Sequence, residues 1–136
     1  HFSIGLLGIA NFNAPHWLAA IGILLLIPGL WLFWRSHADL GRNWSVTTEL
    51  REEHTLVSRG VYDRVRHPMY SAIWLIFLSY PFLIHYWIVG SAAIVAFAIM
   101  YVVRVPIEEA MMRKEFGDAY QVYAARTGRI WPRLWN

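Results

Sequence analysis

Two long stretches without Asp, Glu, Lys or Arg restrict the fold of this chain more than any other feature. The first runs from Trp17 to Trp34, and the second from Ala72 to Val103. As a helix, the first stretch of about eighteen residues is roughly 27 Å long, close to the ~30 Å hydrocarbon core of a bilayer. The second stretch, about thirty-two residues long, exceeds one ordinary span and predicts two helices joined by a turn.

The composition agrees with a membrane environment. Hydrophobic residues make up 57% of the chain and charged residues only 15%, against about 25% charged in soluble domains. We therefore predict an all-α integral membrane protein with transmembrane helices over about 17–34, 70–84 and 87–105. Residues 1–136 are expected to form a single domain. Because His1 is not a Met, the presence of further N-terminal spans is left open.

Basic residues gather on either side of the second apolar stretch. Of the 12 Lys and Arg residues, half lie from Arg35 to Arg66 and half from Arg104 to Arg133. Cytosolic loops carry an excess of these residues, so we expect loop 35–68 and the C-terminus on the cytosolic side. After Pro106, apolar side chains recur near one helical face, which predicts a C-terminal amphipathic helix along the membrane surface.

Polar motifs lie at the expected cytosolic boundary. The sequence RHPMY at 66–70 puts a guanidinium, an imidazole and a phenol where the chain enters the second span. Interfacial anchoring by snorkelling side chains is an alternative explanation for this motif. The segments LGRNWS at 40–45 and HTLVSRGVY at 54–62 belong to a loop that is longer than a connection requires. Such length favours a functional element.

Two adjacent carboxylates, Glu108 and Glu109, follow Arg104 at the other end of the apolar region. Neighbouring side chains on a helix point about 100° apart, so we expect these two to have different surroundings. The alternative is an electrostatic role only, because acidic residues just after Pro106 favour the start of a helix.

Taken in order, these motifs resemble one family of membrane enzymes. LGRNWS, HTLVSRGVYDRVRHPMY, an apolar hairpin and EEAMMRKEFGDAYQVYAARTGRIWP cover roughly Leu40 to Pro132. The arrangement is similar to isoprenylcysteine carboxyl methyltransferases and to their relatives among the phospholipid methyltransferases. The resemblance implies methyl transfer from S-adenosyl-L-methionine to a lipophilic acceptor in the bilayer. A carboxylate, as in isoprenylcysteine O-methylation, is the favoured acceptor.

The same resemblance implies the residues of the site. Arg104 matches the substrate-binding arginine, and Asn43 and Trp44 are placed near the pocket. The implied cofactor-binding residues are His54, Thr55, Leu56, Val57, Tyr62, His67, Pro68, Met69, Tyr70, Glu108 and Glu109. The implied partners are the lipid bilayer and a lipophilic or prenylated substrate.

Two other functions fit parts of the sequence. Membrane reductases of the sterol type, which use NADPH, share a similar C-terminal architecture and a related RHP segment, whereas the pair of glutamates favours methyl transfer. A non-catalytic membrane scaffold is the third hypothesis. No nucleic-acid partner is expected, because the net charge of +3 is not gathered on one basic face. No metal site is expected, because the six His residues are scattered along the chain.

Overall fold

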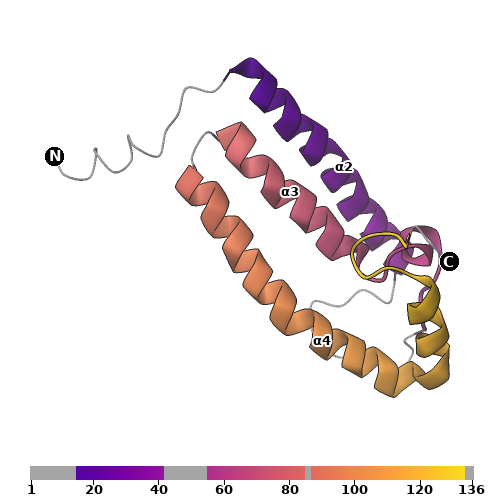
Figure 1. The fold of residues 1–136 in the computed structure, drawn as a ribbon. Coiled ribbons are helices and arrows are strands. Elements are labelled where there is room, and N and C mark those ends of the chain that lie inside the picture. Colours follow the sequence, from indigo (N-terminus) through magenta and orange to yellow (C-terminus); the bar gives the residue numbers. More distant parts are fainter. Residues whose placement is uncertain (1–14, 42–54, 85–86, 134–136) are drawn as a thin grey trace.

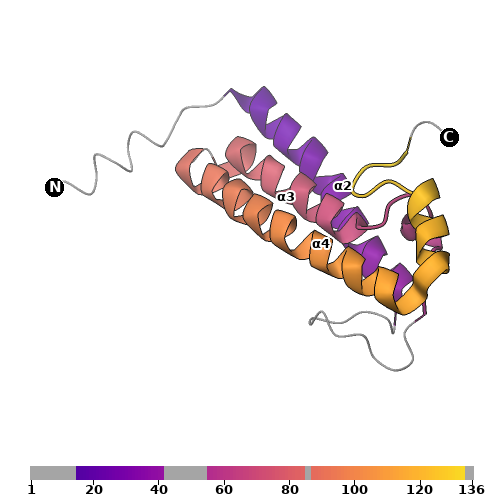
Figure 2. The same ribbon diagram turned by 60° about the horizontal axis from the view of Figure 1, so that its bottom comes forward.

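The computed structural model describes residues 15–41, 55–84 and 87–133, and within them all the regular structure is helical. The elements are α2 (His16–Leu40), the 3-10 helix η2 (Gly60–Asp63), α3 (Pro68–Ile84) and α4 (Trp87–Arg126). Figures 1 and 2 show α3 between α2 and the first part of α4, with the three helices side by side. The predicted all-α fold is confirmed for these residues.

Glycines bring α2 and α3 close together. A Cβ atom placed on Gly22 would lie 2.6 Å from Cγ of Leu83, and one on Gly29 would lie 3.0 Å from Cγ1 of Ile76. Small residues allow the backbones of two apolar helices to approach, so that dispersion contacts hold the pair where no water drives it together. The pairing of an early glycine with a late α3 residue shows that the two helices are antiparallel.

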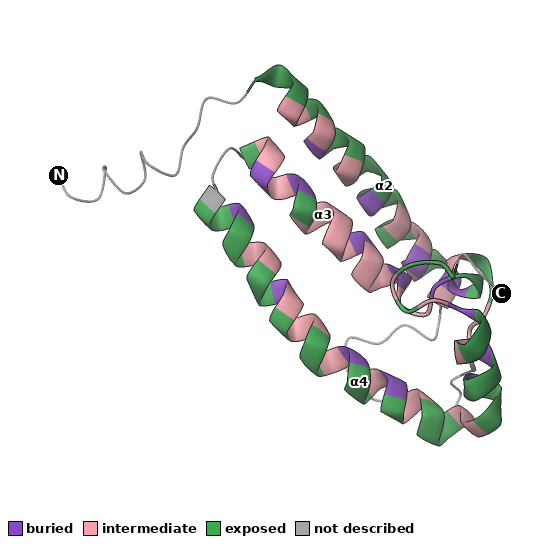
Figure 3. Cartoon of the chain, viewed as in Figure 1, coloured by how far each residue is buried: buried purple, intermediate pink, exposed green. Residues whose placement is uncertain are grey.

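The outward faces of the helices are apolar. Large side chains such as Leu24, Ile99 and Val102 are more than half exposed, and Figure 3 shows the exposed class along α2 and α4, whereas α3 between them is mostly of the intermediate and buried classes. Helices α2 and α4 are long and apolar enough to cross a membrane, and α3 is an apolar helix of 17 residues, shorter than these two. Contact with lipid or with another apolar partner is more favourable for an apolar surface of this extent than contact with water.

The helix α4 differs from the sequence-based expectation. The predicted span ended near residue 105 and a separate amphipathic helix followed Pro106, but the observed helix runs through Pro106, leaves the helical conformation at Gly117 and then continues to Arg126. A proline inside a helix removes only one backbone hydrogen bond, which leaves the helix continuous here. The change of direction occurs at Gly117, where φ is 50°, a conformation that a residue without Cβ adopts without steric cost.

The bend at Gly117 returns the chain to the start of α3 (Figures 1 and 2). There the two segments exchange backbone hydrogen bonds: Arg66 N donates to Gly128 O at 2.8 Å, and Gly128 N donates to Arg64 O at 3.1 Å. His67 N donates to Arg129 O at 2.9 Å. The RHPMY and TGR motifs, far apart in the sequence, are therefore adjacent in space.

Replacing Gly29 with Leu should weaken the α2–α3 contact, because the new side chain overlaps Leu75 and Ile76. We expect a loss of about 1–3 kcal/mol in the free energy of unfolding, the usual cost of overpacking. Thermal unfolding of detergent-purified protein measures it. The exposed Ala20 on the same helix provides the control, since Ala20→Leu should leave the unfolding temperature unchanged; equal losses in both variants would contradict close packing at Gly29.

Candidate functional site

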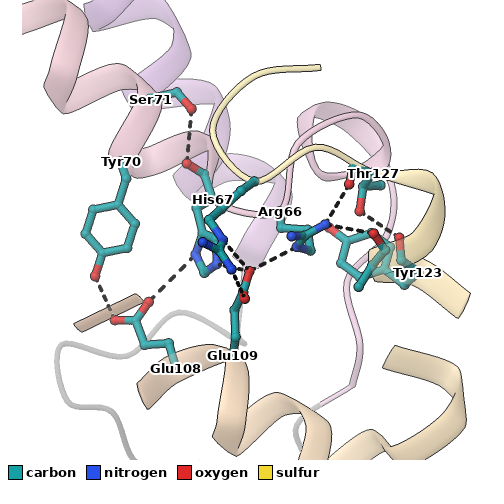
Figure 4. A network of polar contacts seen from close by, with 10 residues as sticks. Arg66, His67, Tyr70, Ser71, Glu108, Glu109, Tyr123 and Thr127 are labelled. Atoms are coloured by element: carbon teal, nitrogen blue, oxygen red, sulfur yellow. Dashed lines mark hydrogen bonds and ion pairs between the residues drawn. The ribbon is translucent and has the colours of Figure 1, made fainter. Parts of the chain in front are cut away.

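The carboxylate of Glu109 is the centre of a buried ion cluster (Figure 4). The residue is 2% exposed. Its Oε1 accepts hydrogen bonds from Nε of Arg66 and from Nε of Arg129, both at 3.1 Å, and its Oε2 accepts one from Nη2 of Arg129 at 2.8 Å. Both oxygens are thus bonded to arginines. A buried carboxylate is tolerated only with this kind of pairing, because its desolvation is otherwise too costly.

Arg66 extends the cluster to the last turn of α4. Its Nη1 donates to the carbonyl oxygens of Ala124, at 2.8 Å, and Thr127, at 2.6 Å. Helix ends leave carbonyl groups without intrahelical partners, and a guanidinium satisfies two of them here. The hydroxyl of Ser71 adds a bond to the carbonyl of Ile130 at 2.6 Å. The C-terminal segment is therefore fixed to the start of α3 by side chains as well as by backbone.

Glu108 lies in a second, more open cluster. Its Oε1 accepts a hydrogen bond from the Tyr70 hydroxyl at 2.7 Å and one from Nε of Arg104 at 3.3 Å, and Nη2 of Arg104 is 3.2 Å away. Its Oε2 lies 3.8 Å from Nδ1 of His67 and accepts no hydrogen bond from a described side chain. Glu108 is 23% exposed and Arg104 41%. This cluster therefore keeps one carboxylate oxygen and part of a guanidinium available to a ligand.

The imidazole of His67 lies between the two glutamates (Figure 4). Its Nε2 is 3.4 Å from Oε1 of Glu109, yet this buried nitrogen has no hydrogen-bond partner of good geometry among the described residues. A buried polar atom without a partner is uncommon and calls for an explanation. This nitrogen faces the buried Glu109, whereas Nδ1 of the same ring faces the more open Glu108.

Electrostatics separate the two glutamates further. The part of α4 without charged residues ends at Val103, so Glu109 lies beyond the segment that can span a membrane. Contact with His67 and the ion pairs with Arg129 and Arg66 hold the pKa of Glu109 well below its usual range, against the opposing effect of burial. Glu109 therefore stays ionised at neutral pH and acts as a fixed anion.

Tyrosines close the cluster on the side of η2. The hydroxyl of Tyr123 donates to the carbonyl of Tyr62 at 2.7 Å, and both residues are buried. Burial raises the pKa of each phenol above its ordinary value, so both stay neutral. Asp39 at the end of α2 accepts a hydrogen bond from Val61 N at 2.9 Å, which holds η2 against α2.

The structure brings together five of the residues predicted from the sequence, namely His67, Tyr70, Arg104, Glu108 and Glu109. The others are more scattered. Tyr62 contributes its backbone carbonyl, and Pro68 is buried at the start of α3 with Met69 half-buried beside it. Thr55 is exposed, and Leu56 and Val57 are half-buried on the segment before η2. His54, Asn43 and Trp44 lie outside the described residues.

Two residues of the cluster were missed by the sequence analysis. Arg129 belongs to the quoted TGRIWP motif but had no role assigned, and Thr127 is 1% exposed. The available signal was a charged residue in an otherwise apolar C-terminal motif. Asp39 also had a local signal, because it forms an ion pair at 3.0 Å with Arg35, four residues earlier.

Glu109→Gln should destabilise the protein, because it leaves Arg66 and Arg129 without their buried anion. Removing one partner of such a pair costs about 3–5 kcal/mol, which unfolding in detergent can measure. Glu115 is exposed on the same helix, so Glu115→Gln should change stability by less than about 0.5 kcal/mol. A similarly small effect at Glu109 would show that the cluster does not stabilise the fold.

The wild-type protein should also lose stability at low pH. Because the pKa of Glu109 is lower in the folded protein than in the unfolded chain, its contribution is complete above the unfolded value of about 4.3 and is lost as the pH falls below it. Unfolding temperatures measured from pH 7 to pH 3 should therefore drop less in Glu109→Gln than in the wild type. Parallel curves for the two proteins would argue against the low pKa.

Comparison with known proteins extends these observations. A model of the phospholipid methyltransferase family matches residues 17–119. Protein-S-isoprenylcysteine O-methyltransferase B of Arabidopsis thaliana is 30% identical over 116 residues, which make up 81% of this chain and 57% of that protein. The cobalt-zinc-cadmium resistance protein CzcN of Cupriavidus metallidurans is 32% identical over 100 residues, 73% of this chain and 46% of that protein.

A solved structure has the same arrangement of helices. The eukaryotic intramembrane Ras methyltransferase ICMT (isoprenylcysteine carboxyl methyltransferase) superposes with a TM-score of 0.77 at 29% identity, covering 86% of this chain and 43% of that protein. The chain thus spans about half the length of the relatives it matches. The region matched by the family model contains α2, α3 and the Arg104–Glu108 cluster. The resemblance predicted from the motifs is confirmed, and the chain belongs to the phospholipid methyltransferase family.

Proposed function

We propose that this chain forms the catalytic region of a membrane methyltransferase that uses S-adenosyl-L-methionine to methylate a carboxylate on a lipophilic acceptor. The observation that carries the proposal is the Arg104–Glu108 cluster. It holds one cation and one anion, both partly exposed, directly beyond the charge-free part of α4. Such a site offers separate charged groups to a polar cofactor and to an anionic acceptor whose apolar part lies in the bilayer.

Glu108 is the proposed anchor of the cofactor. Its Oε2 is available to accept hydrogen bonds from an ammonium group or from ribose hydroxyls, while Tyr70 and Arg104 hold Oε1 in place. Aromatic rings stand nearby, with the centroids of Tyr70 and Tyr101 5.7 Å apart, and such rings favour a neighbouring cation. When bound, S-adenosyl-L-methionine supplies a methyl group on a positively charged sulfur.

Other residues predicted to bind the cofactor keep that role as part of the proposal. His67 contributes a ring nitrogen beside Glu108, and the segment with His54, Thr55, Leu56 and Val57 leads to η2, where Tyr62 lies. For Glu109 we propose a positioning role instead. Its two oxygens are already bonded to Arg66 and Arg129, and the cluster they form supports the backbone from which His67 and Tyr70 project.

Arg104 is the proposed group for the acceptor. A guanidinium forms charge-assisted hydrogen bonds with carboxylates, and its position at the end of the apolar part of α4 suits an acceptor held in lipid. A carboxylate is already ionised at neutral pH, so methyl transfer to it requires positioning and a dry site rather than a base. The low pKa of Glu109 makes that residue a poor base, which agrees with an acceptor of this kind.

The membrane orientation is proposed on two grounds. Helices α2 and α4 have the length and hydropathy of spans, and α3 is apolar along its whole length. All 12 Lys and Arg residues fall in the segments 35–66 and 104–133, which by the positive-inside rule places loop 35–68 and the C-terminus in the cytosol. The site then faces the cytosolic boundary, where a soluble cofactor and a membrane-borne acceptor can meet.

Glu108→Gln should weaken binding of S-adenosylhomocysteine, the product form of the cofactor, by roughly 10- to 100-fold. A hydrogen bond to a charged group contributes about 1.5–3 kcal/mol. Calorimetric titration of detergent-purified protein measures the affinity, with Glu115→Gln on the same helix as the matched control. Unchanged affinity in Glu108→Gln would remove this residue from the cofactor site.

The same titration distinguishes the competing functions. Saturable binding of S-adenosylhomocysteine without binding of NADPH is the expected result. Binding of NADPH alone would instead establish the reductase, and binding of neither compound by the folded protein would favour the scaffold.

Arg104→Ala should raise the KM for a prenylated carboxylate acceptor about 10-fold or more, while the affinity for S-adenosylhomocysteine changes less, because Tyr70 still holds Glu108. Loss of one charge-assisted hydrogen bond of about 1.5–3 kcal/mol corresponds to that factor. Arg104→Lys keeps the charge but not the two-pronged geometry, so we expect it to recover activity only in part. Arg113 is exposed on the same helix, and a KM raised equally by Arg113→Ala would indicate a nonspecific effect of charge.

A further inference from the structure

A cavity of about 700 Å³ lies apart from the Arg104–Glu108 cluster. Its walls come from the second half of α2, from η2, from the first half of α3 and from residues 130–132. The α3 side chains that line it include Ser71, Leu75 and Leu78, whereas Tyr70 of the same helix bonds to Glu108. The cavity and the proposed catalytic site therefore use different faces of α3. We call this cavity the α2–α3 groove.

The α2–α3 groove is polar at one end and apolar at the other. Two arginines line the same end of it: Arg35 lies near the end of α2, and Arg64 directly follows η2. Trp31 lies one helical turn before Arg35, and Leu78 lies about 15 Å along α3 from its first residue at 1.5 Å per residue. Both arginines are thus on the proposed cytosolic side, and the apolar wall continues toward the middle of the bilayer.

The charge at the polar end is only partly compensated. Arg35 pairs with Asp39 at 3.0 Å, with 42% of its side chain exposed. Arg64 is exposed and forms no ion pair with any side chain in the described ranges. Among the described residues, the lining contains these two arginines and no carboxylate. An anion at this end would be favoured by both guanidinium groups.

Two tryptophans indicate that the groove lies at the level where the hydrocarbon core of a membrane meets the headgroups. Trp31 and Trp131 line it and are 55% and 69% exposed. Tryptophan is enriched where hydrocarbon meets headgroups. An open apolar cavity between helices at this level takes up hydrocarbon in preference to water, because water there would lose its hydrogen bonds.

We propose that the α2–α3 groove binds an anionic membrane phospholipid, with its phosphate between Arg35 and Arg64 and one acyl chain along Trp31, Leu75 and Leu78. Guanidinium groups suit phosphate through paired, charge-assisted hydrogen bonds, and basic pockets between spanning helices are known to hold anionic headgroups. This lipid is distinct from the methyl acceptor. Because the walls come from separate segments, the bound lipid joins α2 to the C-terminal segment.

Native mass spectrometry of the detergent-purified protein tests the proposal. Phosphatidylglycerol and phosphatidylcholine with identical acyl chains are added in parallel. We expect phosphatidylglycerol to be retained at least 10-fold more strongly, and to raise the unfolding temperature of the protein, since a ligand that binds only the folded state stabilises it. Equal retention of the two lipids, or retention of neither, would overturn the proposal.

Two double variants, one in the groove and one outside it, test where the lipid binds. Arg35→Gln combined with Arg64→Gln should abolish the preference for phosphatidylglycerol. The control combines Arg113→Gln with Lys114→Gln, which removes the same charge from exposed positions outside the groove and should keep the preference. Persistence of the preference in the first variant, or its loss in the control, would refute the assignment.

A second variant tests the apolar end without changing any charge. Leu78 is 40% exposed at the groove, and Leu78→Trp should fill the space of the acyl chain and reduce retention of both lipids at least 5-fold. Unchanged retention would place the lipid elsewhere. Lipid-free dimers in the wild-type spectrum would also overturn the proposal, since a second copy of the chain would then cover the groove.

Discussion

The ion cluster around Glu109 is the interaction that joins the start of α3 to the C-terminal segment, and the rest of the candidate site depends on it. One carboxylate, buried to 2% exposure, accepts hydrogen bonds from Arg66 before α3 and from Arg129 after α4. Without this anion the two positive guanidinium groups that contact its Oε1 would repel each other. By binding both groups, the carboxylate overcomes that repulsion and joins two segments that are distant in the sequence.

Glu108 and Glu109 are adjacent on α4 but have different surroundings. A rotation of about 100° per residue turns Glu109 toward Arg66 and Arg129, and turns Glu108 toward Tyr70 and the more open side. Burial and complete hydrogen bonding make the first carboxylate part of the framework. The second is partly exposed, and its Oε2 accepts no hydrogen bond from a side chain that the structure describes. The two side chains are chemically identical, and only their hydrogen-bond partners give Glu109 a structural role and leave Glu108 in the candidate site.

Much of this could be predicted from the sequence because the signals are local. Charge-free stretches set the positions of α2, α3 and α4, and the order of RHPMY and the glutamate pair indicated which side chains would meet. The contacts of Glu109 could not be predicted, because Arg66 and Arg129 lie 43 and 20 residues away from it and no local periodicity records such a pairing. The continuity of α4 was missed for another reason. Pro106 is a strong local signal for a helix boundary, but a proline inside a helix removes only one backbone hydrogen bond, and α4 continues through it.

The return of the chain after Gly117 has a consequence for biosynthesis. Translation proceeds from the N-terminus at about 5–20 residues per second, so Arg129 is added about one to four seconds after Glu109, which precedes it by 20 residues. Of the three residues in this ion cluster, Arg129 is therefore the last to be synthesised, and the bridge between Arg66 and Glu109 can form before the second cation joins it.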